Sequence, residues 1–255
     1  MKLEEFNYDL PKELIAQEPA EPRDSCRLMM VDKKTGEWEH HHFRDILDEI
    51  REGDVFVFNN TKVIPARLYG KKKDTGGKVE MLLLTPKGND TWEVLVNPGR
   101  KALPGVEIEF TENCYCKVLD KTEFGGRLVE FHYDGNFDSL LDQIGEMPTP
   151  PYIHKKLGNN DEYQTVYAKY KGSAAAPTAG LHFTPELMEE MKKKGAKLLF
   201  VTLHVGIGTF RPVSEENIED HEMHKEWYTV SEETAKEVNA ARAEGRRVIA
   251  VGTTS

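Results

Sequence analysis

Helix and strand signals alternate along the beginning of the chain. Residues 27–31 form a short apolar run typical of a buried strand, and residues 54–58 form a second one. Four apolar residues between these runs share one face of a predicted helix, which Gly53 would end: Phe43, Ile46, Leu47 and Ile50. This alternation predicts α/β structure for the first part of the chain.

The middle of the chain has a different pattern. From about residue 66 to residue 133, short stretches of alternating apolar and polar residues, such as 106–110, are separated by turns rich in glycine, proline and asparagine. Closely spaced strands without a helical stretch predict a small antiparallel barrel or sandwich. Because α/β signals flank this region on both sides, we predict an inserted domain at 66–147, carried by an α/β domain at 1–65 and 148–255.

Helix and strand signals return in the last part of the chain. Thr184 before Pro185 predicts a helix start, and Ser231 before two glutamates predicts another. Residues 197–203 are predicted to be a buried strand, and residues 248–251 are predicted to be the next strand, which is apolar. The second of these strands runs into Gly-Thr-Thr-Ser, a turn that should lead into a helix, so we expect the α/β domain to be C-terminally incomplete.

Composition and charge restrict the class of protein. The chain is 38% hydrophobic and 31% charged, and no apolar run approaches the length that spans a membrane. Three cysteines without a signal peptide favour the reducing cytoplasm, and the spacing of Cys114 and Cys116 fits a strand better than a zinc site.

The net charge of −10 argues against nucleic acid, but its distribution does not. Residues 60–101 contain nine basic and four acidic residues, which makes a local basic region. Charge alone leaves two interpretations open, a face that binds RNA and a solvated lysine-rich hairpin.

Two runs of small residues, 172–183 and 203–210, each contain one histidine. Small residues let backbone N–H groups approach a ligand closely, and neither run has the spacing of a regular strand or helix. Both runs therefore predict pocket walls, with His182 and His204 as candidate acid–base groups. His221 and His224 lie three residues apart beside carboxylates, which fits acid–base chemistry and, less well, metal binding.

Several of these motifs occur together, in the same order, in a known family. The chain resembles the S-adenosylmethionine:tRNA ribosyltransferase-isomerases of queuosine biosynthesis over almost its whole length. The matching runs are 58–68, 147–153, 163–167, 175–183, 201–213, 219–224 and 248–255. The resemblance implies a barrel-like α/β domain with an inserted small antiparallel β-barrel, and members continue beyond the Gly-Thr-Thr-Ser motif.

The resemblance also implies an activity. Such enzymes move the ribosyl group of S-adenosylmethionine to 7-aminomethyl-7-deazaguanine at the tRNA wobble position, giving epoxyqueuosine and releasing adenine and methionine. S-adenosylmethionine is a co-substrate, and no metal or redox cofactor is implied. The expected partners are tRNA, through its anticodon loop, and S-adenosylmethionine, and we expect a cytoplasmic monomer without membrane contact.

The site residues are our own hypotheses within this activity, with His182 or His204 as the leading base, His221 and His224 as second candidates, and Tyr152 or Tyr167 to stack an unpaired base of the anticodon loop. The candidate acid–base residues are His182, His204, His221 and His224. The candidate substrate-binding residues are Asn60, Lys62, Arg67, Tyr152, Tyr167, Ala175, Pro177, Thr178, Ala179, Gly180, Gly206, Gly208, Thr209, Thr253 and Thr254. With the resemblance set aside, two other classes stay open: a metal-dependent hydrolase built on the four histidines, and an RNA-binding module without catalysis.

Overall fold

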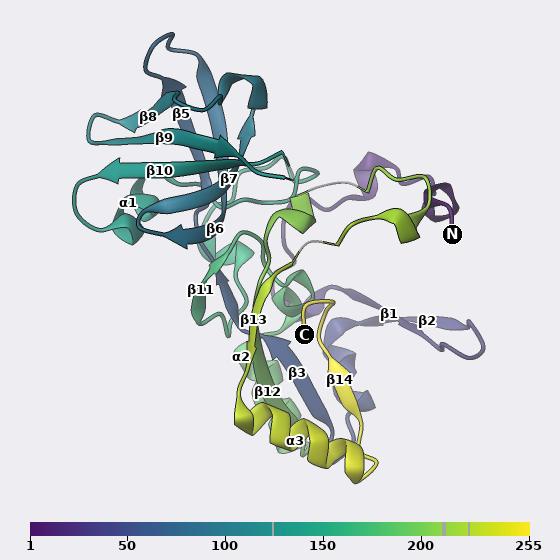
Figure 1. Cartoon of the computed structure of the whole chain (residues 1–255). Coiled ribbons are helices and arrows are strands. Elements are labelled where there is room, and N and C mark those ends of the chain that lie inside the picture. The colour runs from purple at the N-terminus through teal and green to yellow at the C-terminus, as the bar shows by residue number, and fades with distance from the viewer. Residues whose placement is uncertain (124, 211–212, 224) are drawn as a thin grey trace.

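A closed six-stranded antiparallel barrel forms one end of the molecule (Figure 1). The structure, a computed structural model, describes residues 1–255 except 124, 211–212 and 224, and except the side chains of 207 and 209. Around the barrel the strands follow the order β10, β7, β6, β5, β8, β9. Their bounds are β5 Arg67–Lys72, β6 Lys78–Gly88, β7 Thr91–Asn97, β8 Glu107–Thr111, β9 Cys114–Lys121 and β10 Arg127–Tyr133. The predicted barrel is confirmed.

The alternation along each barrel strand places apolar side chains inside. Leu68, Met81 and Ile108 are fully buried, and Cys114 and Cys116 join the same core on β9, as their alternation predicted. Strand β5 approaches β8 so closely that a Cβ on Gly70 would lie 2.8 Å from the Glu109 carbonyl oxygen. Helix α1 (Phe137–Ile144) packs against this core through Leu141.

The α/β part is built on a four-stranded sheet in the order β13, β12, β3, β14. Strands β12 (Lys197–His204) and β14 (Val248–Ala250) run parallel to the central β3 (Val55–Asn59), and β13 (Trp227–Val230) runs antiparallel to β12. The predicted fold class, α/β with an inserted antiparallel barrel, is confirmed, whereas the domain bounds stay a prediction.

Both faces of β3 are covered, which explains its unbroken apolar sequence. Phe56 and Phe58 pack in one cluster with α2 (Pro185–Lys193), and Val55 and Val57 pack in another with Ala241 of α3 (Glu232–Ala243). The predicted caps are confirmed: Thr184 accepts a hydrogen bond from Leu187 N–H, and Ser231 accepts one from Thr234 N–H.

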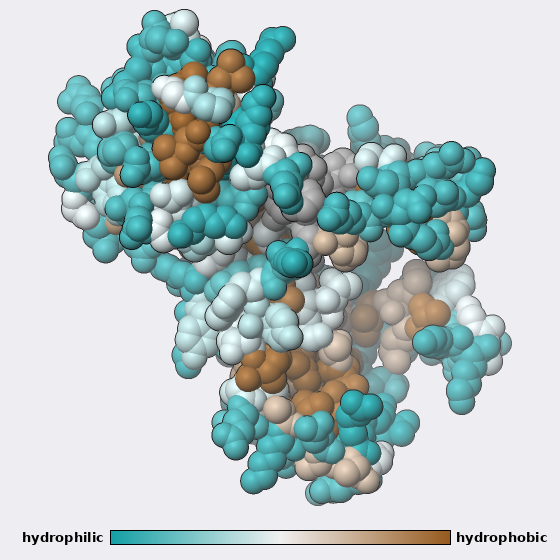
Figure 2. Space-filling view, in the orientation of Figure 1, coloured by the Kyte–Doolittle hydropathy of each residue, from teal (hydrophilic) through white to brown (hydrophobic). Residues whose placement is uncertain are grey.

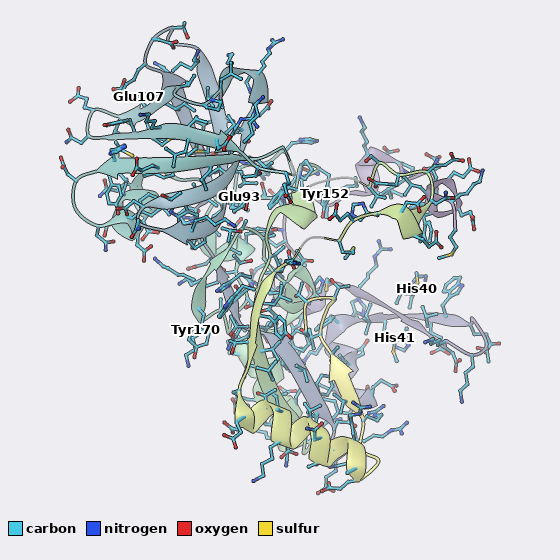
Figure 3. The ribbon with its side chains drawn as sticks, in the orientation of Figure 1. His40, His41, Glu93, Glu107, Tyr152 and Tyr170 are labelled. Atoms are coloured by element: carbon cyan, nitrogen blue, oxygen red, sulfur yellow. The ribbon has the colours of Figure 1, made fainter. Side chains whose placement is uncertain are left out.

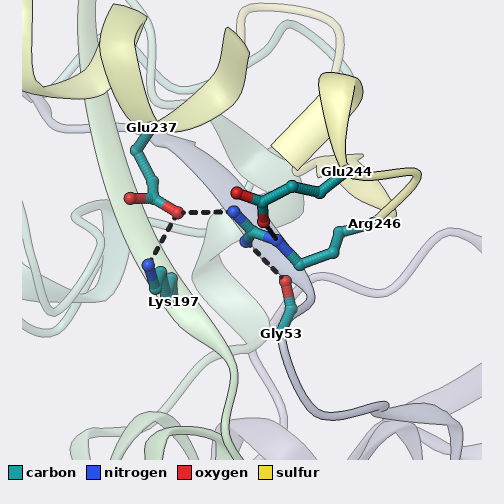
Figure 4. A network of polar contacts seen from close by, with 5 residues as sticks. All are labelled: Gly53, Lys197, Glu237, Glu244 and Arg246. Carbon is teal, nitrogen blue, oxygen red and sulfur yellow. Dashed lines mark hydrogen bonds and ion pairs between the residues drawn. The ribbon is translucent and has the colours of Figure 1, made fainter. Parts of the chain in front are cut away.

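Ion pairs connect helix α3 to the strands of this sheet and to the segment that follows the helix. Arg246 joins Glu237 and Glu244 and donates to the Gly53 carbonyl, and Glu237 also pairs with Lys197 of β12 (Figure 4). Beside this network, Arg247 forms hydrogen bonds with the buried carboxylate of Asp54 and holds its pKa below the usual range. These contacts join α3 to the amino ends of the parallel strands β3, β12 and β14.

One strand was wrongly predicted to be buried. Strand β1 (Arg27–Val31) pairs only with β2 (Trp38–His42), and this hairpin projects from the molecule (Figure 1). Met29 and Val31 are 57% and 60% exposed, because no helix or further strand of the described residues covers their face of the hairpin. The adjoining helical face is present as η4 (Phe43–Glu49), a 3-10 helix that packs Phe43 into the core.

A short parallel pair connects the two parts of the fold. Strands β4 (Thr61–Val63) and β11 (Tyr170–Ser173) lie beside the larger sheet and lead to the barrel and to the first small-residue run. Figure 2 shows hydrophobic side chains gathered above α3, over the region of the four-stranded sheet, whose outer residues Val230 and Val248 are partly exposed. None of the helices in the described part of the chain has the length and apolar character needed to cross a membrane.

Candidate active site

A cavity of about 620 Å³ lies where the carboxyl ends of the parallel strands β12 and β14 meet the barrel. Ligands of open α/β sheets bind at this end of the strands. Eight of the predicted substrate-binding residues line the cavity: Arg67, Tyr152, Ala175, Pro177, Thr178, Ala179, Thr253 and Thr254. Its other lining residues are Pro150, Pro151, Tyr163, Ala176, Val205, Phe210 and Gly252.

The first small-residue run forms one wall and is anchored to the end of β12. The Ser173 hydroxyl accepts a hydrogen bond from Val205 N–H at 2.9 Å and donates one to the Ala175 carbonyl at 2.7 Å. Ala174 N–H donates to the Val205 carbonyl at 3.0 Å. These bonds use backbone groups of an irregular segment that no strand pairs, so the wall is held without bulky side chains.

The turn after β14 closes the cavity against this wall. Gly252 has φ of +92°, a conformation that L residues rarely adopt, and a Cβ there would lie 3.2 Å from the Ala179 Cβ. The close approach of these two small residues brings Thr253 and Thr254 into the cavity lining. The small-residue run at 172–183 and the Gly-Thr-Thr-Ser turn, which are far apart in the sequence, therefore lie together at the cavity.

Arg67 is the one charged side chain among the described residues that line the cavity. Its Nη2 donates to the Thr149 carbonyl at 3.2 Å, and its Nε lies 3.3 Å from Glu80 Oε1 without hydrogen-bond geometry. Tyr152, labelled in Figure 3, is 53% exposed and adds an aromatic ring to the lining. Apolar walls with a few hydroxyls and one cation suit a ligand that combines a flat base with polar groups.

His182 ends η7 (Thr178–His182), the 3-10 helix whose first residues line the cavity, but it does not itself line it. Its Nδ1 lies 3.1 Å from Cys26 Sγ, and its ring packs 5.1 Å from that of Phe43. Burial lowers the pKa of His182 and raises that of the Cys26 thiol, so both groups favour their neutral forms and either can donate the hydrogen between them. When Nδ1–H donates to the sulfur, Nε2 keeps its lone pair and can accept a proton.

His204 ends β12 and is enclosed more tightly. Its Nδ1 lies 2.7 Å from the Thr61 hydroxyl, and its ring stacks on Trp227 with centroids 4.9 Å apart. A Cβ on Gly172 would lie 2.8 Å from Nε2, so this glycine packs directly over the second nitrogen. Burial lowers the pKa of His204 as well, but both ring nitrogens already face protein groups.

The remaining candidates whose side chains the structure describes do not line the cavity. His221 pairs with Glu215 at 2.8 Å, and His224 lies outside the described residues. Asn60 accepts a hydrogen bond from the Thr202 hydroxyl, and Lys62 lies on β4. Gly206 N–H donates to Glu226, while Gly208 and Thr209 belong to η8 (Ile207–Phe210), which contributes Phe210 to the lining.

Tyr167 is in the core and not in the cavity. Its ring packs against Phe58 and Phe200, and its hydroxyl is buried without a hydrogen-bond partner among the described residues. Gly180 lies against it, since a Cβ at this position would fall 1.9 Å from the Tyr167 oxygen. Of the two tyrosines predicted to stack a base, Tyr152 alone lines the cavity.

The basic region of the sequence is partly neutralised in the fold. Barrel closure places β5 beside β8, where Lys73 pairs with Glu107 at 3.0 Å and Lys71 is in register with Glu109. Lys87 pairs with Glu93 at 3.1 Å on neighbouring strands. Counting charges within 60–101 missed the acidic residues that pairing brings in from outside this range.

Metal-ligand geometry is not found in the described part of the chain. Leaving aside the undescribed residues, His224 among them, no three His, Cys, Asp or Glu side chains converge as metal ligands would. Sequence reasoning also missed Cys26 as the partner of His182, because 156 positions separate the two residues and no local pattern joins them.

The fold and the cavity define an α/β protein with an inserted barrel and a small-residue ligand site between the two. Relatives named S-adenosylmethionine:tRNA ribosyltransferase-isomerase match it closely. Those of Thermoanaerobacter sp. (strain X514) and Caldanaerobacter subterraneus subsp. tengcongensis are each 58% identical to it, covering 100% of this chain and 75% of the relative.

A solved structure of an S-adenosylmethionine tRNA ribosyltransferase from Thermotoga maritima is also similar. It is 36% identical, with 96% of this chain and 68% of that chain covered and a TM-score of 0.43. The model of the queuosine biosynthesis protein family matches residues 3–255. The chain belongs to this family.

Proposed function

We propose that this chain transfers and isomerises the ribosyl group of S-adenosylmethionine onto 7-aminomethyl-7-deazaguanine at the wobble position of tRNA. The products are epoxyqueuosine-tRNA, adenine and methionine. The observation that carries this assignment is the cavity of about 620 Å³ at the carboxyl ends of the strands, with its small-residue walls and with Arg67 as the one cation among its described lining residues. Family membership supports the reaction, and the cavity supports its location.

The reaction requires proton transfers that the chain's own residues can make. The sulfonium acidifies the neighbouring C5′ hydrogens, the attacking aminomethyl nitrogen loses a proton, and departing adenine gains one. A base that is uncharged near neutral pH suits the first two steps. We assign this role to His182, because burial keeps its imidazole neutral and Cys26 occupies only Nδ1.

Binding roles are divided among the walls. Ala175 to Ala179 and the turn from Gly252 to Thr254 would enclose the nucleoside and methionine parts through close backbone approach. Arg67 and Tyr152 would contact the target nucleotide, one through charge and the other through stacking. The proposal includes S-adenosylmethionine as co-substrate without a further cofactor, an anticodon loop as partner, and a cytoplasmic monomer.

Filling the cavity tests its assignment. Ala179→Leu adds a bulky side chain at the point where the two walls meet, so we expect the KM for S-adenosylmethionine to rise about tenfold or more, since overfilling a packed site costs ~1–3 kcal/mol. Adenine release at varied S-adenosylmethionine concentration measures this change. Ala243→Leu, at an exposed position near the end of α3, is the matched control.

The two variants separate cavity filling from general damage. Ala243→Leu should melt within a few degrees of the parent chain. The larger side chain at Ala179 also presses on Gly252, so the KM of each variant is measured well below its Tm, where the chain is folded. An Ala179→Leu enzyme with the parent KM would place S-adenosylmethionine in another part of the molecule.

A further inference from the structure

A second cavity adjoins the first through Arg67. It has a volume of about 320 Å³, and Arg67 lines both cavities. Tyr69 lines the second cavity, two residues further along β5. Leu68 between them points into the barrel core, so Arg67 and Tyr69 lie side by side on the outer face of β5, about 6.6 Å apart along the strand.

The walls of the second cavity combine an aromatic ring with cations. Tyr69 is 52% exposed on strand β5 of the barrel. Facing it, the segment after α1 contributes His154, Lys155 and Lys156. An exposed ring next to a cluster of cations is the combination with which proteins hold single-stranded RNA, through base stacking and phosphate contacts.

Lys155 and Lys156 each form an exposed ion pair, which leaves both side chains available to bind a phosphate group. Lys155 pairs with Glu18, and Lys156 pairs with Glu146 at 3.2 Å. The side chains of Lys155 and Lys156 are 58% and 86% exposed, so both pairs are solvated and weak, and a phosphate can replace the carboxylate as partner. Glu146 is the one carboxylate that lines this cavity in the described part of the chain.

Beyond Tyr69 the character of the surface reverses. A third cavity, of about 690 Å³, continues along β5 and is lined by Lys71 and Lys78 but also by Glu80, Glu109 and Glu112. The excess of carboxylates repels a phosphate backbone. The lining of the second cavity, which adjoins the first, is therefore cationic, and this cationic surface ends at Tyr69.

We propose that the second cavity binds the nucleotide of the tRNA loop that neighbours the modified base, with Tyr69 stacking its base and Lys155 and Lys156 holding its phosphate. This inference rests on the proposed function, because it places the modified base in the first cavity. The nucleotide next to the modified base must then lie just outside the opening of the first cavity. Arg67 lines both cavities, so the second cavity is the adjoining place for that nucleotide. Tyr69 and both lysines thus act as binding residues for RNA and not for S-adenosylmethionine.

Two substitutions at Tyr69 test stacking. Tyr69→Ala is expected to weaken binding of an anticodon stem-loop RNA about tenfold, since stacking of one base contributes ~1–3 kcal/mol, whereas Tyr69→Phe should stay within about twofold. Fluorescence anisotropy of the labelled stem-loop measures both. Tyr170→Ala is the control, because Tyr170 is 48% exposed on β11 and lines none of the three cavities (Figure 3).

Charge reversal tests the phosphate contact. Lys156→Glu should weaken stem-loop binding and reduce the slope of log Kd against log salt by about one, whereas the exposed Lys193→Glu on α2 should change neither. Parent-like stem-loop binding by Tyr69→Ala and by Lys156→Glu would overturn the inference, as would equal losses for Tyr69→Ala and Tyr69→Phe. A parent chain that binds the stem-loop but releases no adenine would instead overturn the proposed function.

Discussion

Alanine at His182 is expected to slow adenine release by roughly 100-fold or more, which is the usual contribution of a positioned general base. His182 is the stronger of the two leading candidates because of its surroundings. Cys26 occupies Nδ1 alone, and His182 ends the 3-10 helix whose first residues line the cavity. His204 has Thr61 at Nδ1 and Gly172 over Nε2, so its nitrogens are already enclosed.

The pH dependence follows from the same environment. Burial lowers the pKa of His182, so its imidazole stays neutral and basic at neutral pH. Activity should therefore fall as the pH drops through this lowered pKa, below the ordinary histidine value of about 6.5. The measurement is the pH profile of adenine release by the parent chain.

His41→Ala is a suitable control for His182→Ala. His41 lies on the projecting β1–β2 hairpin (Figure 3), where it pairs with the exposed Glu39. The His41→Ala variant should turn over within about twofold of the parent chain, as variants with a substitution at an exposed position away from the site do. Parent-like turnover in both His182→Ala and His204→Ala would remove the two histidines from the catalytic list.

Gly180→Ala is expected to destabilise the chain by about 3 kcal/mol, at the upper end of the cost of overpacking. The added Cβ would lie 1.9 Å from the Tyr167 hydroxyl oxygen and 3.0 Å from Thr165 Cγ2. Tyr167 cannot move aside easily, because its ring packs edge-on against Phe58 in the core. Thermal unfolding should show a decrease in Tm of roughly 8 °C for a chain of this size.

A second substitution identifies the cause of that loss. Tyr167→Phe alone should be neutral or slightly stabilising, because it removes a buried hydroxyl that has no hydrogen-bond partner among the described residues. Combined with Gly180→Ala, it should restore part of the stability, since the clashing oxygen is gone. Additive effects of the two changes would contradict this account of the Gly180 contact.

Local signals predicted those parts of the fold that local physics determines. The caps at Thr184 and Ser231 were readable because the capping side chain and the N–H that it satisfies lie within three residues of each other. The barrel was readable from alternation and turns. Burial of β1 was not, because a run of apolar residues does not reveal whether another element will cover it.

The site likewise has features that the local sequence predicted and others that depend on the complete fold. The small-residue run at 172–183 predicted one cavity wall, because tight backbone approach requires such residues in the sequence itself. Of the described residues in the run at 203–210, Val205 and Phe210 line the cavity and the two glycines do not. The resemblance to a known family added Arg67 and the Thr253–Thr254 turn, which line the cavity. Contacts between distant positions, such as Cys26 with His182 or Lys73 with Glu107, depend on the complete fold and left no local pattern.

The central claim is that S-adenosylmethionine serves this chain as a ribosyl donor. The most direct measurement is the release of free adenine from S-adenosylmethionine in the presence of tRNA carrying 7-aminomethyl-7-deazaguanine, with tRNA carrying guanine at the same position as control. The account predicts adenine and methionine in equal amounts with the modified tRNA and neither with the control. No adenine with the modified tRNA, or S-adenosylhomocysteine as the product, would contradict it.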